Sequence, residues 1–194
     1  MDKIKVIIVG FGGRGQLFGD YTVKDERTEL VAIADVNPDA RLTAAKAYGV
    51  REENCFKDAS EIFAKGKIAD VAFICTQDKQ HREHAIAALE LGYDVCLEKP
   101  IAATMEDCEA IYEVQKKTGR KVMVCHVLRY SHFYMALRKI IKSGEIGDVV
   151  TISQTENVAY WHDAHSYVRG AWRNKEESSP MILAKCCHDL DIIF

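Results

Sequence analysis

Residues 4–15, IKVIIVGFGGRG, decide the fold, because a short apolar run ends there in closely spaced glycines. Continuous apolarity is typical of a strand buried on both faces of a parallel sheet. The pattern G-x-G-x-x-G after such a strand permits a tight turn, close approach of the backbone to a pyrophosphate, and helix–strand packing. The helix that follows offers N–H groups and partial positive charge to phosphates. The predicted cofactor-binding turn consists of Gly10, Gly12, Gly13, Arg14 and Gly15.

An acidic residue follows the second apolar run, where a dinucleotide fold places the carboxylate that binds the ribose 2′-hydroxyl. This residue is Asp35, twenty positions after Gly15. Its charge would repel the 2′-phosphate of NADP, and neither Val36 nor Asn37 adds a cation. Arg41 could reach the same region, but an arginine in a first helical turn is more typical of a solvated surface charge. The sequence therefore favours NAD over NADP.

The rest of the first 125 residues alternates apolar runs with helical segments. The expected strands are Ile4–Val9, Leu30–Ala34, Val71–Cys75, Val95–Leu97 and Val122–Cys125. The expected helices are Arg14–Val23, Asp39–Tyr48, Ala59–Ala64, Gln80–Leu91 and Met105–Lys117. This alternation predicts a doubly wound α/β domain with a parallel sheet over residues 1–125.

The pattern changes in residues 126–194. We expect a helix over Tyr130–Lys142, a strand over Val149–Val158, a loop over Tyr160–Glu177 and a helix over Pro180–Phe194, with Ser179 as its N-cap. This segment is too short for a complete domain that contains a sheet. The chain also ends without a helix stop signal, so we expect a truncated polypeptide.

The composition is that of a cytoplasmic globular protein. The chain has 26 basic and 29 acidic residues and a net charge of −3, which gives no electrostatic footprint for nucleic acid or an anionic membrane. No apolar run approaches the roughly 18 residues that span a bilayer. Seven cysteines without a C-x-x-C pair indicate reduced thiols and no metal site. His81 and His84 are expected to be solvated or capping, whereas His162 and His165 are candidate substrate contacts.

A charged pair, Glu98-Lys99, stands at the end of a buried strand and precedes Pro100, which cannot continue the sheet. Ligands of open α/β sheets bind at this edge. A lysine there would hydrogen-bond a substrate hydroxyl and stabilise alkoxide character as a hydride leaves. Lys99 is therefore a candidate catalytic residue.

These motifs, with Cys75-Thr-Gln, Trp172-Arg173 and a C-terminal histidine, resemble the Gfo/Idh/MocA family of sugar and polyol oxidoreductases. The resemblance implies a Rossmann domain followed by a mixed α/β substrate domain, of which residues 126–194 would be the first part. It implies that Gly12, Asp35, Thr76, His81 and Glu98 lie around the dinucleotide. It also implies that Lys99 is the catalytic lysine and contacts the cofactor. It also implies that Trp172 and Arg173 close over the cofactor or substrate.

The family resemblance further assigns His188 as the catalytic histidine, with Asp191 also matching. The family has an Asp four residues before this histidine, where the chain has Ala184. On a continuous helix Lys185 would share a face with His188. We expect Lys185 to replace the carboxylate as a polar neighbour and to keep His188 a neutral base.

The expected function is NAD-dependent hydride transfer to or from a sugar, polyol or related cyclic alcohol, in a protein that is a homo-oligomer at full length. Two alternatives stay open. One is a glycoside-cleaving enzyme that uses retained NAD for transient oxidation. The other is a dinucleotide-binding regulator without catalysis.

Overall fold

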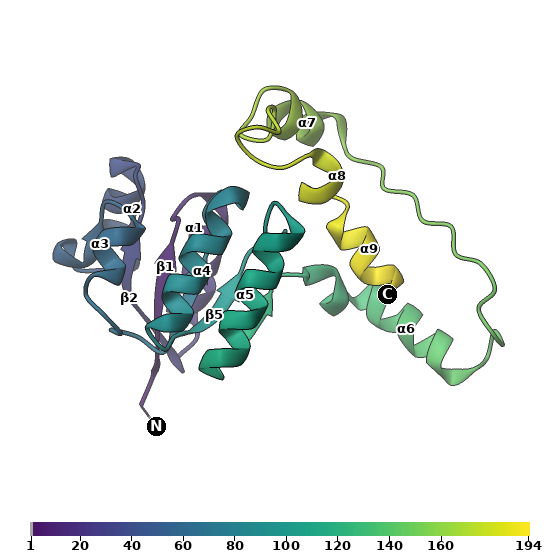
Figure 1. Cartoon of the computed structure of the whole chain (residues 1–194), viewed down its shortest axis with the longest axis horizontal. Helices are drawn as coiled ribbons and strands as arrows, with labels where there is room; N and C mark the ends of the chain where they lie inside the picture. The colour runs from purple at the N-terminus through teal and green to yellow at the C-terminus, as the bar shows by residue number, and fades with distance from the viewer. Residues whose placement is uncertain (1) are drawn as a thin grey trace. The chain divides into compact units, whose positions relative to one another are not determined.

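The chain folds into two compact units, which a computed structural model describes over residues 2–194 (Figure 1). The first unit ends at Val124, and the second comprises Cys125–Phe194. Among the described residues, none of the helices is both long and apolar enough to cross a lipid bilayer.

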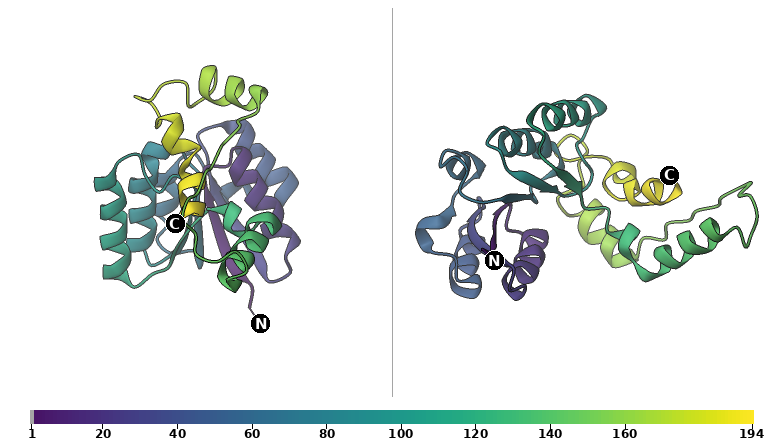
Figure 2. Two further views of the ribbon diagram at one scale, coloured as in Figure 1. Left: turned by 90° about the vertical axis from the view of Figure 1, so that its right-hand side faces the viewer. Right: turned by 90° about the horizontal axis from the view of Figure 1, so that it is seen from below.

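The first unit is a six-stranded, entirely parallel sheet with helices on both faces (Figure 2). Its strand order is β3-β2-β1-β4-β5-β6. The strands are β1 (Ile4–Val9), β2 (Thr28–Ala34), β3 (Cys55–Phe56), β4 (Val71–Ile74), β5 (Asp94–Leu97) and β6 (Val122–Val124). The helices are α1 (Gly13–Lys24), α2 (Pro38–Tyr48), α3 (Ala59–Phe63), α4 (His81–Glu90) and α5 (Met105–Thr118). The predicted α/β Rossmann fold is confirmed.

Two apolar layers hold this sheet between its helices. Ile7 and Val9 of β1 pack with residues of α3, α4 and α5. Val6 and Ile8, which point to the opposite face, pack with α2 and with Phe18 of α1. Because both faces of β1 are covered, its sequence is apolar without alternation.

The direction of winding reverses between β1 and β4, which pair side by side although two strands separate them in the sequence. In open α/β sheets such a switch point creates a crevice at the carboxyl ends of the strands. Two helices of this unit begin at capping side chains: Asn37 caps α2 through the Asp39 N–H, and Thr104 caps α5 through the Asp107 N–H. Strand β3 was not predicted, because two residues are too short for a periodic signal.

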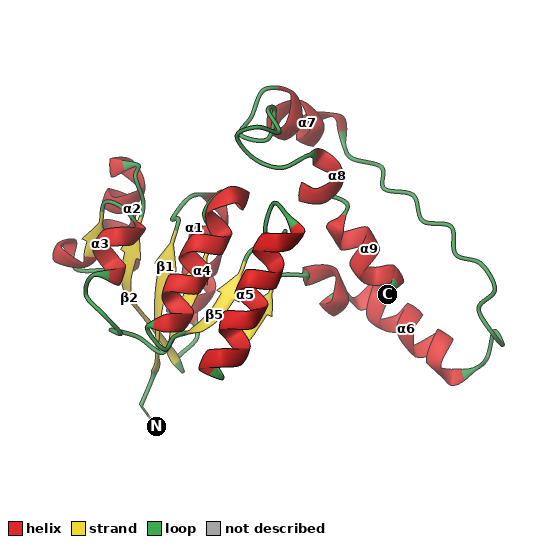
Figure 3. Cartoon of the chain, in the orientation of Figure 1, coloured by secondary structure: helices red, strands yellow, loops and turns green. Residues whose placement is uncertain are grey.

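The second unit is helical where it has regular structure (Figure 3). It comprises 3₁₀ turn η3 (Val127–Tyr130), α6 (His132–Ser143), α7 (Tyr160–Asp163), π-helical turn η4 (Ala164–Val168), α8 (Met181–Ala184) and α9 (Cys187–Ile193). The expected helix over Tyr130–Lys142 corresponds to α6, which begins two residues later.

Three expectations for the second unit are wrong. Val149–Val158 is not a strand: its alternating pattern has no neighbouring strand within residues 125–194 to complete a hydrogen-bonded ladder. The expected loop from Tyr160 contains α7 and η4, because residues 159–169 include no Gly or Pro that would interrupt a helix. The expected helix from Pro180 is interrupted at Lys185-Cys186, and Pro180 itself, not Ser179, occupies the N-cap of α8.

Candidate functional site

The glycine turn after β1 is closely packed on one side and open on the other. Gly10 has φ +87°, and a methyl group there would lie 2.6 Å from the Cys75 carbonyl oxygen. A methyl group on Gly15 would overlap the Gly10 carbonyl. At Gly12 and Gly13, in contrast, an added methyl would meet no atom within 4 Å. This open side, at the start of α1 where no side chain caps the helix, fits a pyrophosphate.

Asp35 holds two backbone segments together. Its Oδ2 accepts a hydrogen bond from the Phe11 N–H at 2.6 Å, and its Oδ1 accepts one from the Asn37 N–H at 2.8 Å. Arg41 lies beside it: Nη1 donates to the carbonyl oxygens of Asp35 (2.7 Å) and Val36 (3.1 Å). The expectation that Arg41 is merely a solvated surface charge is therefore wrong, because its guanidinium group caps the carbonyls at the end of β2.

A cavity of about 260 Å³ opens at the carboxyl ends of β1, β2 and β4. Asp35 and the glycine turn form one side of it, and Thr76 and His84 contribute from the β4–α4 region. Its lining residues are Gly10, Gly12, Ala34, Asp35, Val36, Asp58, Ala59, Cys75, Thr76, Gln77, Gln80 and His84. The mixture of an open glycine turn, a carboxylate and the exposed Val36 side chain suits a nucleotide with phosphate, ribose and base parts.

Both histidines of α4 are buried, contrary to the expectation that they are solvated or capping. His84 Nδ1 lies 3.0 Å from the Thr76 hydroxyl, and burial lowers the pKa of His84. His81 Nδ1 lies 2.7 Å from the Pro100 carbonyl oxygen, and its Nε2 lies 3.1 Å from the Thr76 carbonyl oxygen. His81 therefore ties the loop after β4 to the loop after β5, and His84 is a cavity residue that the sequence pattern did not reveal.

Glu98 joins the end of β5 to the start of α1. Its Oε1 pairs with Arg14 Nε at 2.7 Å, and its Oε2 accepts the Lys99 N–H at 3.1 Å. The Glu98 side chain is buried, whereas that of Arg14 is half-exposed and stacks over Phe18. Lys99 follows, and its peptide bond to Pro100 is cis. The first unit thus brings the glycine turn, Asp35, Thr76, Glu98 and Lys99 to the same edge of the sheet.

In the second unit, Lys185 is not placed as expected. Its Nζ pairs with Glu156 Oε1 at 2.9 Å, and the helix is interrupted directly after it. Lys185 and His188 therefore do not share a continuous helix face. The ring that contacts His188 is His126, whose centroid lies 5.8 Å away in an edge-to-face arrangement. Sequence reasoning missed His126, because no local spacing relates it to α9.

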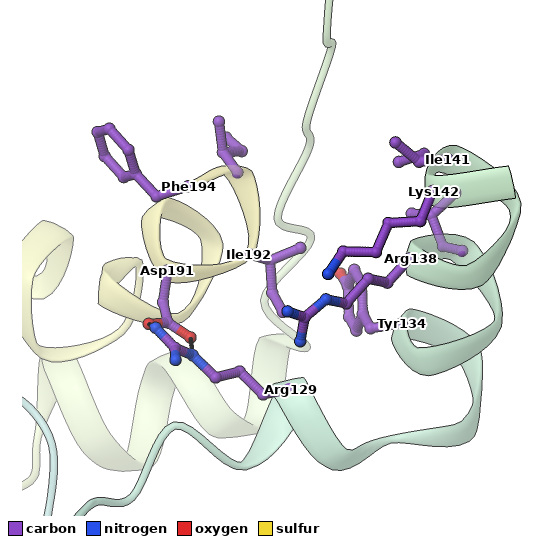
Figure 4. A pocket seen from close by; sticks show the side chains of 10 residues that line it. Arg129, Tyr134, Arg138, Ile141, Lys142, Asp191, Ile192 and Phe194 are labelled. Carbon is purple, nitrogen blue, oxygen red and sulfur yellow. Dashed lines mark hydrogen bonds and ion pairs between the residues drawn. The ribbon is translucent and has the colours of Figure 1, made fainter. Parts of the chain in front are cut away.

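Asp191 lies between an arginine and this histidine pair. Arg129 binds it through two nitrogens, with Nε–Oδ2 at 2.7 Å and Nη2–Oδ1 at 2.5 Å (Figure 4). His126 Nε2 lies 3.8 Å from Asp191 Oδ1. The hydrogen bonds from Arg129, followed by the charge of His126, hold the pKa of Asp191 below its usual value. The carboxylate also borders a cavity of about 350 Å³, lined by Arg129, Tyr134, Leu137, Arg138, Ile141, Lys142, Asp191, Ile192, Ile193 and Phe194.

The other residues implied by the resemblance also lie in the second unit. The backbone N–H of Trp172 donates to the Ser166 carbonyl oxygen. The centroid of the Trp172 ring lies 6.4 Å from that of Tyr167. Arg173 is exposed, and its N–H donates to Gly170. His162 packs against Trp161 and Tyr167. Closure of Trp172 and Arg173 over a cofactor stays a prediction. Within residues 2–194, His, Cys, Asp and Glu side chains form no group of three that could hold a metal ion.

The profile of an oxidoreductase family with an NAD-binding Rossmann fold, Gfo/Idh/MocA, matches residues 4–126. Inositol 2-dehydrogenase of Klebsiella pneumoniae subsp. pneumoniae is 33% identical over 147 residues, which cover 75% of this chain and 43% of that protein. The crystal structure of the WlbA dehydrogenase from Bordetella pertussis with NADH and UDP-GlcNAcA is similar with a TM-score of 0.83 at 25% identity, over 100% of this chain and 57% of the other. Myo-inositol 2-dehydrogenase from Lactobacillus plantarum has the same fold, with a TM-score of 0.83 at 21% identity over 99% and 56% of the two chains. The chain spans about half the length of the curated relatives it matches.

Proposed function

Since the chain belongs to the Gfo/Idh/MocA family of oxidoreductases with an NAD-binding Rossmann fold, we propose that the protein transfers a hydride between NAD and a carbinol carbon of a cyclic polyol or sugar. The observation that carries this proposal is the cavity at the switch point of the sheet, where the open glycine turn meets Asp35 and Thr76. The names of the relatives, among them several inositol dehydrogenases, support the substrate class.

The residues of the first unit divide the binding of NAD among them. Gly12, Gly13 and the first N–H groups of α1 bind the pyrophosphate, because they are open and uncapped. Asp35 accepts the ribose hydroxyl while it braces the turn through Phe11. Arg14 neutralises Glu98, so that this buried carboxylate does not repel the phosphates.

When bound, the nicotinamide supplies a carbon that accepts or returns the hydride. Lys99 donates a hydrogen bond to the substrate hydroxyl and stabilises the negative charge that develops on its oxygen. His188 accepts the hydroxyl proton in oxidation and returns it in reduction. The balance is simple: the carbinol loses a hydride to the cofactor and a proton to the base, and becomes a carbonyl.

The test follows the hydride itself. The protein is incubated with NAD and with cyclic polyols or sugars that carry deuterium on the carbinol carbon, and the cofactor is analysed by mass spectrometry. We expect deuterium in NADH, and we expect Lys99→Met to abolish this transfer while NAD affinity measured by calorimetry stays within about twofold. Binding of NAD without deuterium transfer from any of these substrates would contradict the proposal and favour a regulator. A carbonyl intermediate with no net NADH would favour transient oxidation.

A further inference from the structure

His188 needs a neighbour that fixes its protonation, and the structure offers a candidate other than Lys185. Three facts exclude Lys185: the helix is interrupted after it, its ammonium group pairs with Glu156 at 2.9 Å, and the ring beside His188 is that of His126. The two imidazole rings meet edge to face, at an interplanar angle of 84°. His126 is mostly buried, with 16% of its side chain exposed.

The two imidazoles are not equivalent, because one carboxylate lies within ion-pair distance of His126. Asp191 Oδ1 lies 3.8 Å from His126 Nε2, and the charge of His126 acts more strongly on Asp191 than that of His188. Arg129, on η3, holds the carboxylate in place through two hydrogen bonds and keeps it ionised. An adjacent negative charge favours the protonated form of an imidazole, so the first proton of the pair belongs on His126.

Lys185 and Asp189, which lie close to His188 in the sequence, each have a partner of their own. Lys185 is paired with Glu156, and Asp189 Oδ1 accepts a hydrogen bond from Gln154 at 2.9 Å. Burial raises the pKa of the Cys186 thiol, which is therefore protonated near neutral pH. His126, whose ring contacts that of His188, and Asp191, on the same helix, both bear on the charge of His188.

We propose that His126 is the positioning residue of His188: it takes the first proton of the imidazole pair and thereby keeps His188 neutral and able to accept a proton. A second positive charge on the adjacent ring is unfavourable, so the two rings titrate as a coupled pair. In this way a histidine performs the electrostatic role that the sequence suggested for Lys185. The inference rests on the proposed function, because it concerns the group that would accept the substrate proton.

The test is an NMR titration of the ¹⁵N-histidine-labelled chain, with ring signals assigned by single substitutions. In the unsubstituted chain we expect the His126 midpoint to lie above that of His188. Two charges about 6 Å apart at an effective dielectric constant of about 20 shift a midpoint by about 1 to 2 pH units. We therefore expect the His188 midpoint to rise by about this amount in both His126→Asn and His126→Phe. The matched control His132→Asn, at the exposed start of α6, leaves it unchanged.

The phenylalanine variant separates charge from packing, because it keeps an aromatic ring beside His188. If its His188 midpoint equals that of the unsubstituted chain, ring packing alone matters and the proposal is overturned. A reversed order of the two midpoints in the unsubstituted chain overturns it without any variant. The titration requires no turnover, so a failure of hydride transfer and a failure of the His126 assignment are separate results.

Discussion

Replacement of Asp35 by serine tests how this chain distinguishes NAD from NADP. The carboxylate accepts two backbone N–H groups, at 2.6 and 2.8 Å, and each hydrogen bond to a charged group contributes about 1.5–3 kcal/mol. Serine can replace one of these bonds at most, and only with a neutral acceptor. We therefore expect Asp35→Ser to lose at least about 1.5–3 kcal/mol of turn stabilisation and ribose binding. The lost hydrogen bond between the carboxylate and the ribose hydroxyl, which is of the same charged kind, corresponds to a loss of about 10- to 100-fold in NAD affinity.

NADP should respond differently because of Arg41. Its guanidinium group already lies 2.7 Å from the Asp35 carbonyl oxygen, and removal of the carboxylate leaves it beside the place where a 2′-phosphate would bind. The ratio of NAD to NADP affinity should thus fall at least about tenfold in Asp35→Ser, and Arg41→Met in the same background should restore part of it.

Calorimetry with both cofactors at two salt concentrations measures these ratios, since an arginine–phosphate contact at a partly exposed site weakens with salt. Asp39→Ser is the matched control, because it removes an exposed carboxylate from the first turn of α2 without touching the glycine turn. If Asp35→Ser keeps both the NAD affinity and the ratio of the unsubstituted chain, the assignment of Asp35 to the ribose is refuted.

Three further predictions concern the first unit. Gly15→Ala should lower stability by about 1–3 kcal/mol and weaken NAD binding, because the added methyl overlaps the Gly10 carbonyl. Gly13→Ala, the control, should change the melting temperature little. Thermal unfolding of the two variants tests this. Tyr93→Phe should lower the free energy of unfolding, measured with urea, by about 2–4 kcal/mol. The Tyr93 hydroxyl accepts a hydrogen bond from the Ile68 N–H and donates one to the Gly66 carbonyl, both at 2.8 Å. A loss below about 0.5 kcal/mol would contradict this. Because burial lowers the pKa of His84, the unfolded chain binds the proton first, so stability is full above about pH 6.5 and declines as the pH falls below it. The free energy of unfolding followed against pH should show this decline in the unsubstituted chain and a weaker one in His84→Asn.

The first unit was predictable because its signals are local. β1 has the predicted bounds, and the caps at Asn37 and Thr104 follow from residue type and position alone. The role of Asp35 as a brace for Phe11 was not predictable in the same way, since spacing indicates a ribose contact but not which backbone group the second oxygen accepts.

The second unit was less predictable because its structure depends on partners distant in the sequence. The alternation of Val150 and Ile152 predicts a strand, yet a strand forms only beside another strand. The ion pair of Lys185 with Glu156 and the ring contact of His188 with His126 both join residues that are far apart along the chain. Helical spacing alone therefore does not indicate which ring lies beside His188.

The buried imidazole of His81 has a consequence for the order of events in turnover. It spans from the Thr76 carbonyl, on the loop that borders the nucleotide cavity, to the Pro100 carbonyl, next to Lys99. If a nucleotide restrains the first loop, the contacts of His81 carry this restraint to the second loop, so we expect binding of the dinucleotide to order Lys99 before the substrate binds. We expect compulsory-order kinetics with the cofactor as leading reactant, which product-inhibition patterns would reveal, and random addition once His81→Ala has cut the tie between the loops.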